Sequence, residues 1–422
     1  MTSLTLRRAA VEGHDSLVSV HIRDGVITGV SEEDDHRSRR PATEVIDLEG
    51  RVLVSAFAEP HLHLDKALLG SPPGGATLPE AIAATAERKR SFTEADVLDR
   101  ALDVARQAIS HGTTIMRAHT EVDPTVGLIS VDAVSRLAER LAGVLDVRLA
   151  ILPQEGILCR PGTLELLRAA LDRPGTVVGG CPYVEGSLDD ARAHIDIVLD
   201  LAERYGTPAD LHLDFADDTR DARQHLASYL AKATIARGLN GRVTIGHATS
   251  LGSLTHDQRG PILDELAAAD IAVVLLPATD LYLMGRSDDG PVRRGLAPLR
   301  DLWSRGIRTA ISSNNIRNAF TPTGSADPLD IALLTARVTH LVSQDDFARV
   351  LAMCSTAAAE IIDPDSRRGV AVGAVADLVA LDSRDLATVI HDQPDRTLVL
   401  ARGRVVYREQ RERTWPEWPS ST

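Results

Sequence analysis

Histidines that follow apolar, strand-like segments are the residues of this chain whose types and spacing could do chemistry. His61 and His63 come soon after the apolar run 52–58. Side chains two apart on a strand point to the same face, and two imidazoles converging at a strand end form half of a site for zinc or iron(II). A lone His-X-His pair is a weak signal. It gains weight from three later polar segments: Asp210-Leu-His-Leu-Asp214, Ile245-Gly-His-Ala-Thr249 and Ser312-Ser-Asn-Asn-Ile-Arg317.

The chain between these motifs alternates between apolar, strand-like runs and amphipathic, helical stretches. Counting the run before His61, there are eight strand–helix units, which predicts an α/β fold with a closed parallel (β/α)8 barrel. The expected strands are almost continuously apolar, as strands buried on both faces should be; they cover 52–58, 113–118, 147–152, 177–183, 209–213, 243–245, 271–277 and 309–312. Active sites of such barrels lie at the C-terminal strand ends, where every polar motif falls.

Both chain ends have a different pattern, with short strands separated by turns. Segments 17–22 and 26–30 flank Asp24-Gly25, which predicts a hairpin. Segments 376–382 and 397–409 are also strand-like. We therefore expect one small β domain built from residues 1–55 and 365–422, with the barrel formed by 56–364.

Charge and composition restrict the classes of partner that the protein is expected to bind. The 422-residue chain carries a net charge of −14, which argues against general affinity for nucleic acid or for anionic membranes. Its three cysteines are scattered, as expected for reduced thiols in a cytoplasmic protein. No N-terminal signal pattern and no apolar run of about 20 residues is apparent. A small-molecule substrate is the expected partner, and the sequence leaves a homo-oligomer open.

The whole set of motifs resembles the cytosine deaminase-like branch of the amidohydrolase superfamily, which includes N-isopropylammelide hydrolases. The resemblance covers essentially the whole chain and includes Glu59-Pro-His-Leu-His-Leu-Asp65 and Leu152-Pro-Gln-Glu-Gly-Ile157. It implies one divalent metal, zinc or iron, held by His61, His63 and His212. It further implies that His247 hydrogen-bonds the reacting water, that Gln154 orients the substrate and that Phe320 lies beside it.

Two departures from the family pattern stand at the expected reaction centre. A glutamate three residues after the strand-five histidine passes a proton to the substrate ring in deaminases of this branch, and that position is Phe215 here. The strand-eight aspartate, which binds the metal and takes a proton, is Asn314. Asn314 could ligate weakly through its amide oxygen, or only donate and accept hydrogen bonds, but it cannot accept a proton. General acid–base help is worth about 10²–10⁴-fold in rate, so ordinary cytosine deamination should be badly impaired.

Two functions remain open from the sequence. The first is an atypical amidohydrolase that hydrolyses a C–N bond of a small nitrogen-containing molecule, either cyclic or open-chain, with His247 and Asn314 in the catalytic positions and Phe215 lining an apolar pocket. The second is a catalytically degenerate, metal-free member of the fold that binds a ligand, or a metal-independent enzyme. The metal content of the purified protein distinguishes them.

Overall fold

Eight parallel strands form the barrel, and the computed structural model describes them within residues 3–32, 44–72, 75–215, 220–286, 288–290, 292–411 and 414. They are neighbours in chain order, from β6 at one edge to β13 at the other. Their bounds are β6 Phe57–Leu62, β7 Thr113–Glu121, β8 Asp146–Leu152, β9 Thr176–Gly180, β10 Ala209–Leu213, β11 Val243–His247, β12 Ala272–Leu275 and β13 Thr309–Ile311. The predicted (β/α)8 architecture is confirmed.

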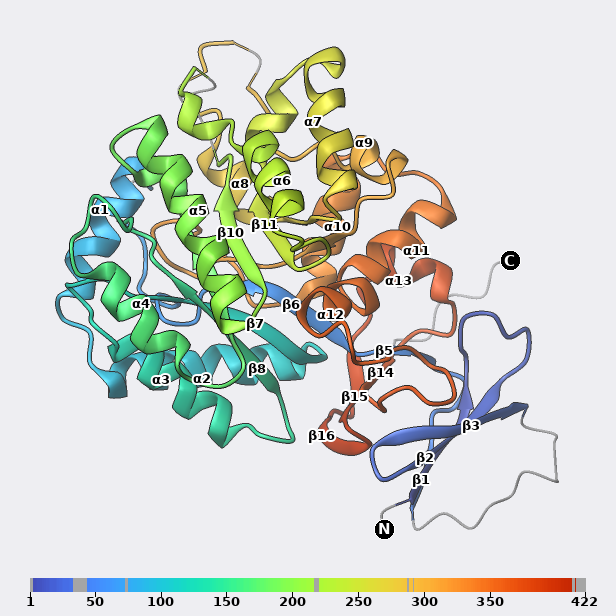
Figure 1. Ribbon diagram of the computed structural model, residues 1–422. Helices are drawn as coiled ribbons and strands as arrows, with labels where there is room; N and C mark the ends of the chain where they lie inside the picture. Colours follow the sequence, from blue (N-terminus) through green and yellow to red (C-terminus); the bar gives the residue numbers. More distant parts are fainter. Residues whose placement is uncertain are drawn as a thin grey trace.

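Helices connect the strands and cover the outside of the barrel (Figure 1). Their apolar faces, such as the Val97, Ala101 and Val104 face of α2, pack on the strands. Those between β6 and β13 are α1 Leu78–Lys89, α2 Glu94–Ser110, α3 Ile129–Arg140, α4 Thr163–Leu171, α5 Leu188–Tyr205, α6 Ala227–Ala236, α7 His256–Ala268, α8 Pro277–Leu283 and α9 Leu299–Ser304. After β13 come α10 Pro328–Val338, α11 Gln344–Met353, α12 Thr356–Ile362 and, further on, α13 Val389–Asp392.

Helix α12 fills one end of the barrel. Its Ala358, Ala359, Ile361 and Ile362 join apolar side chains of the four barrel strands β6, β7, β12 and β13 in a separate cluster. Arg117, fully buried on β7, donates to the carbonyl oxygen of Ile361 at 2.7 Å. With this end closed by packing, chemistry is left to the opposite end, where the strands finish.

The two chain ends form two four-stranded sheets beside the barrel. One contains β1 Ser3–Ala9, β2 Val18–Arg23, β3 Val26–Glu32 and β4 Glu44–Asp47; the other contains β5 Val52–Ser55, β14 Leu378–Leu381, β15 Arg396–Ala401 and β16 Arg404–Arg408. Strand β5 pairs antiparallel with β14, so the N- and C-terminal segments share a sheet. Apolar side chains of both sheets share one core, and Figure 1 shows β1–β3 next to β14–β16. The boundaries near residues 55 and 365 remain our proposal.

One expected strand is divided in two. The apolar run 52–58 was taken as the first barrel strand, but β5 ends at Ser55 in the small sheet and β6 begins at Phe57 in the barrel. Ala56 marks the change, donating to the carbonyl oxygen of Asp377 at 2.9 Å. Both strands are fully buried, so periodicity carried no sign of the switch. Other bounds differ by a few residues; β7, for instance, runs on to Glu121.

None of the helices in the described part of the chain combines the length and apolar character that crossing a bilayer requires.

Candidate active site

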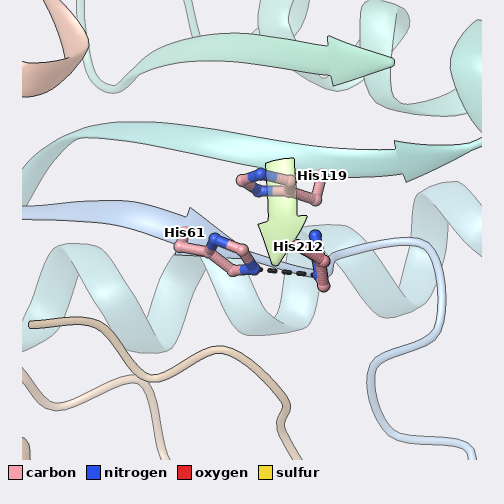
Figure 2. Close-up of side chains that lie close together, drawn as sticks. All are labelled: His61, His119 and His212. Atoms are coloured by element: carbon pink, nitrogen blue, oxygen red, sulfur yellow. Dashed lines mark hydrogen bonds between the residues drawn. The ribbon is translucent and has the colours of Figure 1, made fainter. Parts of the chain in front are cut away.

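Three imidazoles meet at the C-terminal ends of β6 and β10. The Nε2 atom of His212 lies 3.1 Å from Nε2 of His61 and 3.0 Å from Nε2 of His63. All three side chains are almost completely buried. Figure 2 shows the His61 and His212 rings turned toward each other, with His119 above them. The sequence prediction that these three histidines come together agrees with this geometry.

The donor set fits a divalent cation. With zinc–nitrogen bonds of about 2.0–2.1 Å in a tetrahedral site, two ligand nitrogens lie about 3.3 Å apart, close to the two spacings observed. Burial, reinforced by positive charges nearby, holds the pKa of His61, His63 and His212 well below the ordinary histidine value. Neutral imidazoles are the form that binds metal. Without a cation or hydrogen-bond partners, imidazole nitrogens packed this closely in the protein interior would destabilise the fold.

His119 offers an alternative third ligand. Its ring stacks on His61 with centroids 3.7 Å apart, and its ligand atoms lie within 4.8 Å of those of His61 and His212. However, Nε2 of His119 is 3.3 Å from the Asp210 carboxylate, which also accepts from Arg117 at 2.7 Å. Nε2 of His63 lies 3.0 Å from Nε2 of His212 and is paired with no carboxylate among the described residues. We therefore favour His63 as the third ligand.

A glycine makes room for His61. Gly246 lies on β11, and a Cβ atom built there would stand 2.6 Å from Cε1 and 2.8 Å from Nδ1 of the His61 ring. Contacts this short do not occur in folded proteins, so any side chain at this position would displace the imidazole. The absence of a side chain at Gly246 therefore leaves the space that the His61 ring occupies.

Asn314 closes the barrel beside the cluster. Its backbone N–H donates to the His61 carbonyl at 3.2 Å and its carbonyl accepts from the His63 N–H at 2.9 Å. The buried Glu59 carboxylate holds the preceding residue through the backbone N–H (2.9 Å) and Oγ (2.6 Å) of Ser313. The side-chain amide of Asn314 is buried, yet neither its oxygen nor its nitrogen has a hydrogen-bond partner among the described residues. An orphaned buried amide at this place is consistent with a ligand-facing residue.

Backbone strain gathers at the same strand ends. Asp214, His247 and Asn314 adopt left-handed conformations, with φ of 52°, 74° and 59°. Each such residue costs of the order of 1 kcal/mol or more, and such conformations cluster at functional sites because they aim side chains that regular strands cannot. His247 is the most telling of the three, since histidine gains nothing locally from this conformation.

Two side chains, Asp280 and Phe215, contact the His247 ring from different sides. Its Nδ1 atom lies 2.6 Å from Oδ1 of Asp280, on α8, and the Phe215 ring lies on its face with centroids 3.8 Å apart and planes 24° apart. Its ring centroid is 5.2 Å from that of His212 and 5.7 Å from that of His61. Burial raises the pKa of Asp280, against the opposing effect of His247. In the ring tautomer that carries its hydrogen on Nδ1, His247 donates to Asp280 and leaves the lone pair of Nε2 available.

A buried charge network lies at the ends of β7 and β8. Lys66 Nζ donates to Glu121 Oε1 at 2.6 Å and to the amide oxygen of Gln154. Lys89 Nζ binds the other Glu121 oxygen at 2.8 Å. Burial opposes ionisation of Glu121, but the two ammonium groups overcome it and lower its pKa. Asp65, next to Lys66 in the sequence, accepts the Glu121 backbone N–H at 2.9 Å.

An apolar wall faces this network. Phe320 and Phe215 are buried in one cluster with Tyr183, and Lys66 Nζ lies 5.0 Å above the centre of the Phe320 ring. Asn318 fixes the turn, its Oδ1 accepting from the backbone N–H groups of Phe320 and Thr321 at 2.9 and 3.1 Å. Phe215 and Phe320 thus belong to one apolar cluster, and their contact with a substrate stays a prediction.

Other residues considered from the sequence have different positions. Arg317 is exposed and donates to the Gly324 carbonyl at 3.0 Å. Asp214 accepts from the backbone N–H groups of Leu226 and Ala227, so its carboxylate is engaged. Asp217 and Asp218 lie outside the described residues. Sequence reasoning missed Asp280; its only signal is an acidic residue in the otherwise apolar segment 272–283.

Comparisons with known proteins identify the family. The amidohydrolase family model Amidohydro_3 matches residues 160–407. The chain is 28% identical to a pterin deaminase of Rhizobium rhizogenes, over 86% of this chain and 82% of that one. It is 25% identical to the N-isopropylammelide isopropyl amidohydrolase of a Pseudomonas species, over 96% and 98%. The structure of 5-methylcytosine deaminase from Klebsiella pneumoniae, liganded with 5-fluorocytosine, superimposes with a TM-score of 0.91 at 27% identity, covering 98% of this chain and 99% of that one. The chain belongs to the amidohydrolase family.

Proposed function

We propose that this protein hydrolyses a C–N bond of a small nitrogen heterocycle, using one divalent metal held by His61, His63 and His212. The observation that carries the proposal is the approach of two buried imidazoles to Nε2 of His212, which lies 3.1 Å from Nε2 of His61 and 3.0 Å from Nε2 of His63. Homologous amidohydrolases bind a divalent metal, and the related deaminases and amidohydrolases act on C–N bonds. Zinc and iron(II) both suit an imidazole set.

A divalent cation at this point would polarise the carbon under attack and lower the pKa of a water molecule to about 7. The reaction adds the oxygen of water to that carbon, breaks the C–N bond and releases ammonia or an amine carrying the transferred proton. Because His61, His63 and His212 would be engaged in holding the cation, another residue must transfer the proton.

His247 is the base that the geometry supports. Its Nδ1–H is donated to Asp280 at 2.6 Å, so Nε2 is free to take the proton of water and return it to the departing nitrogen. Asp280 holds the ring in that tautomer and would stabilise the imidazolium that forms. This histidine–aspartate pair replaces proton handling by a strand-eight aspartate, which Asn314 cannot supply.

Asn314 and Phe215 limit the proton transfers that the site can carry out. Asn314 offers a neutral amide beside the histidines, and Phe215 covers one face of His247 with an apolar ring. With a single proton-carrying group, the site suits substrates whose leaving nitrogen needs little prior protonation. Cytosine, which needs ring-nitrogen protonation, is therefore not the expected natural substrate.

A second candidate function follows from the same substitutions. A chain that has lost two carboxylates at its reaction centre could bind a heterocycle without turning it over. The orphaned amide of Asn314 would then contact the bound ligand.

An ammonia-release screen separates the two. Protein reconstituted with zinc or with iron(II) is incubated with amino-substituted pyrimidines, pterins and triazines, and His247→Ala protein serves as the control. We expect release from at least one compound class, abolished in the variant. Binding without release across the panel would favour the ligand-binding function.

A further inference from the structure

Lys66 stands at the junction between the charge network and the apolar wall. Its side chain is 2% exposed. Its ammonium donates to Glu121 Oε1 at 2.6 Å and to Oε1 of Gln154, and lies 5.0 Å above the Phe320 ring centre. Two of these three neighbours, Gln154 and Phe320, are the residues expected to touch the substrate.

The contact with Lys66 fixes which way the Gln154 amide faces. An ammonium group has three donors and no acceptor, so only the amide oxygen can turn toward it. The NH2 group therefore occupies the opposite side of the amide, and it has no partner among the described residues. A glutamine free to rotate can read either a donor or an acceptor, whereas one held by its oxygen presents donors.

We propose that Lys66 is a positioning residue that holds Gln154 as a hydrogen-bond donor, so that the site selects heterocycles presenting an acceptor, a carbonyl oxygen or an unprotonated ring nitrogen, at that position. The proposal rests on the proposed function, because it assumes that the substrate lies between the histidines and Gln154. It names the substrate class more narrowly: an amino-substituted ring that also carries an oxo group. A ring with the amino group alone would offer no acceptor to the NH2 of Gln154 and would lose that hydrogen bond.

Lys89 provides a matched control. It is a second lysine of the same network, also 2% exposed, and it binds Glu121 at 2.8 Å and Asp123 at 2.6 Å. It makes no described contact with Gln154. Removing either ammonium group removes one of the two positive charges that contact Glu121, but only the removal of Lys66 frees the Gln154 amide.

The test compares ligand pairs that differ in one oxo group: cytosine with 4-aminopyrimidine, and pterin with 2-aminopteridine. Dissociation constants are measured by calorimetry on zinc-reconstituted full-length protein. We expect the wild type to bind the oxo member of at least one pair roughly tenfold more tightly. Lys66→Met should reduce that preference to within about threefold, while Lys89→Met keeps it. Gln154→Leu, which leaves both lysines in place, should behave like Lys66→Met and covers the case in which Lys66→Met does not fold.

Three outcomes would overturn the inference: equal binding of both members of every pair by the wild type, no binding of any of the four compounds, or a full oxo preference in Lys66→Met or Gln154→Leu. None of these readings needs turnover. Absence of hydrolysis with a clear oxo preference would therefore count against the proposed function and leave the role of Lys66 standing.

Discussion

The ring of Phe215 lies against the imidazole of His247, with centroids 3.8 Å apart and planes inclined by 24°. Phe215 follows His212 of β10 by three residues. In the function that we propose, its hydrocarbon ring covers one face of the base and offers no group that could pass a proton. This contact explains why Asp280, on the other side of His247, gains importance.

Restoring both carboxylates should restore cytosine deamination. The double variant Phe215→Glu/Asn314→Asp gains a proton shuttle and an anionic group beside the histidines, and each proton-transfer group is worth about 10²–10⁴-fold. We expect at least a hundredfold higher cytosine turnover than in the wild type at pH 7, measured as ammonia release. Rapid cytosine turnover by the wild type would mean that another residue relays protons.

Asp280→Asn should damage catalysis while leaving substrate binding intact. The asparagine keeps the size of the side chain but no longer enforces Nδ1–H on His247, so kcat should fall roughly 10²–10⁴-fold with little change in KM. Steady-state kinetics on a substrate from the ammonia-release screen measures this, with metal content and thermal unfolding as controls for an intact site. If kcat is unchanged in a folded, metal-replete variant, Asp280 does not orient the base.

Gly246→Ala should weaken metal binding by pushing the His61 ring aside, since the new Cβ would lie 2.6 Å from that ring. We expect at least a tenfold loss of zinc affinity in a chelator competition. Gly186→Ala is the matched control, because the nearest atom to its Cβ, Oδ2 of Asp190, is 3.8 Å away and its backbone is not left-handed. Equal affinity in the two variants would show that His61 is not a ligand.

Glu185 should make stability depend on pH in the acid range. Burial opposes its ionisation, but His194 and the backbone N–H groups of Ile157 and Cys159 outweigh burial and lower its pKa to about 2 from 4.5. A folded pKa below the unfolded value adds stability above pH 4.5 that is lost as the pH falls toward 2; the full contribution is about 3 kcal/mol. The difference in unfolding free energy between wild type and Glu185→Gln should therefore shrink by about half or more between pH 7 and pH 3 in urea titrations. A pH-independent difference would mean that Glu185 acts through packing alone.

The sequence predicted the barrel because its strands are apolar and separated by amphipathic helices, and because polar residues recur at the strand ends. The change of sheet at Ala56 could not be seen, since β5 and β6 are both buried throughout. Nor was β1 (Ser3–Ala9) recognised, because polar residues interrupt it.

For the site, the spacing of the histidines carried most of the information. Their convergence with Asn314 follows from strand ends meeting at one edge of a barrel. Asp280 escaped because it lies on a helix after strand seven, with no ligand-like spacing to any histidine. Lys66 and its carboxylate partner Glu121 are 55 positions apart in the sequence. Side-chain direction over that separation depends on packing that no local pattern encodes.

The most direct test of a mononuclear metal centre held by His61, His63 and His212 is the metal content of protein purified without chelator, measured by elemental analysis. We predict about one zinc or iron atom per chain in the wild type. His63→Asn and His212→Asn should each lose most of it, while His119→Asn, whose ring stacks on His61 but pairs with Asp210, should keep it. A wild-type protein without metal, or retention in His63→Asn with loss in His119→Asn, would contradict this ligand set.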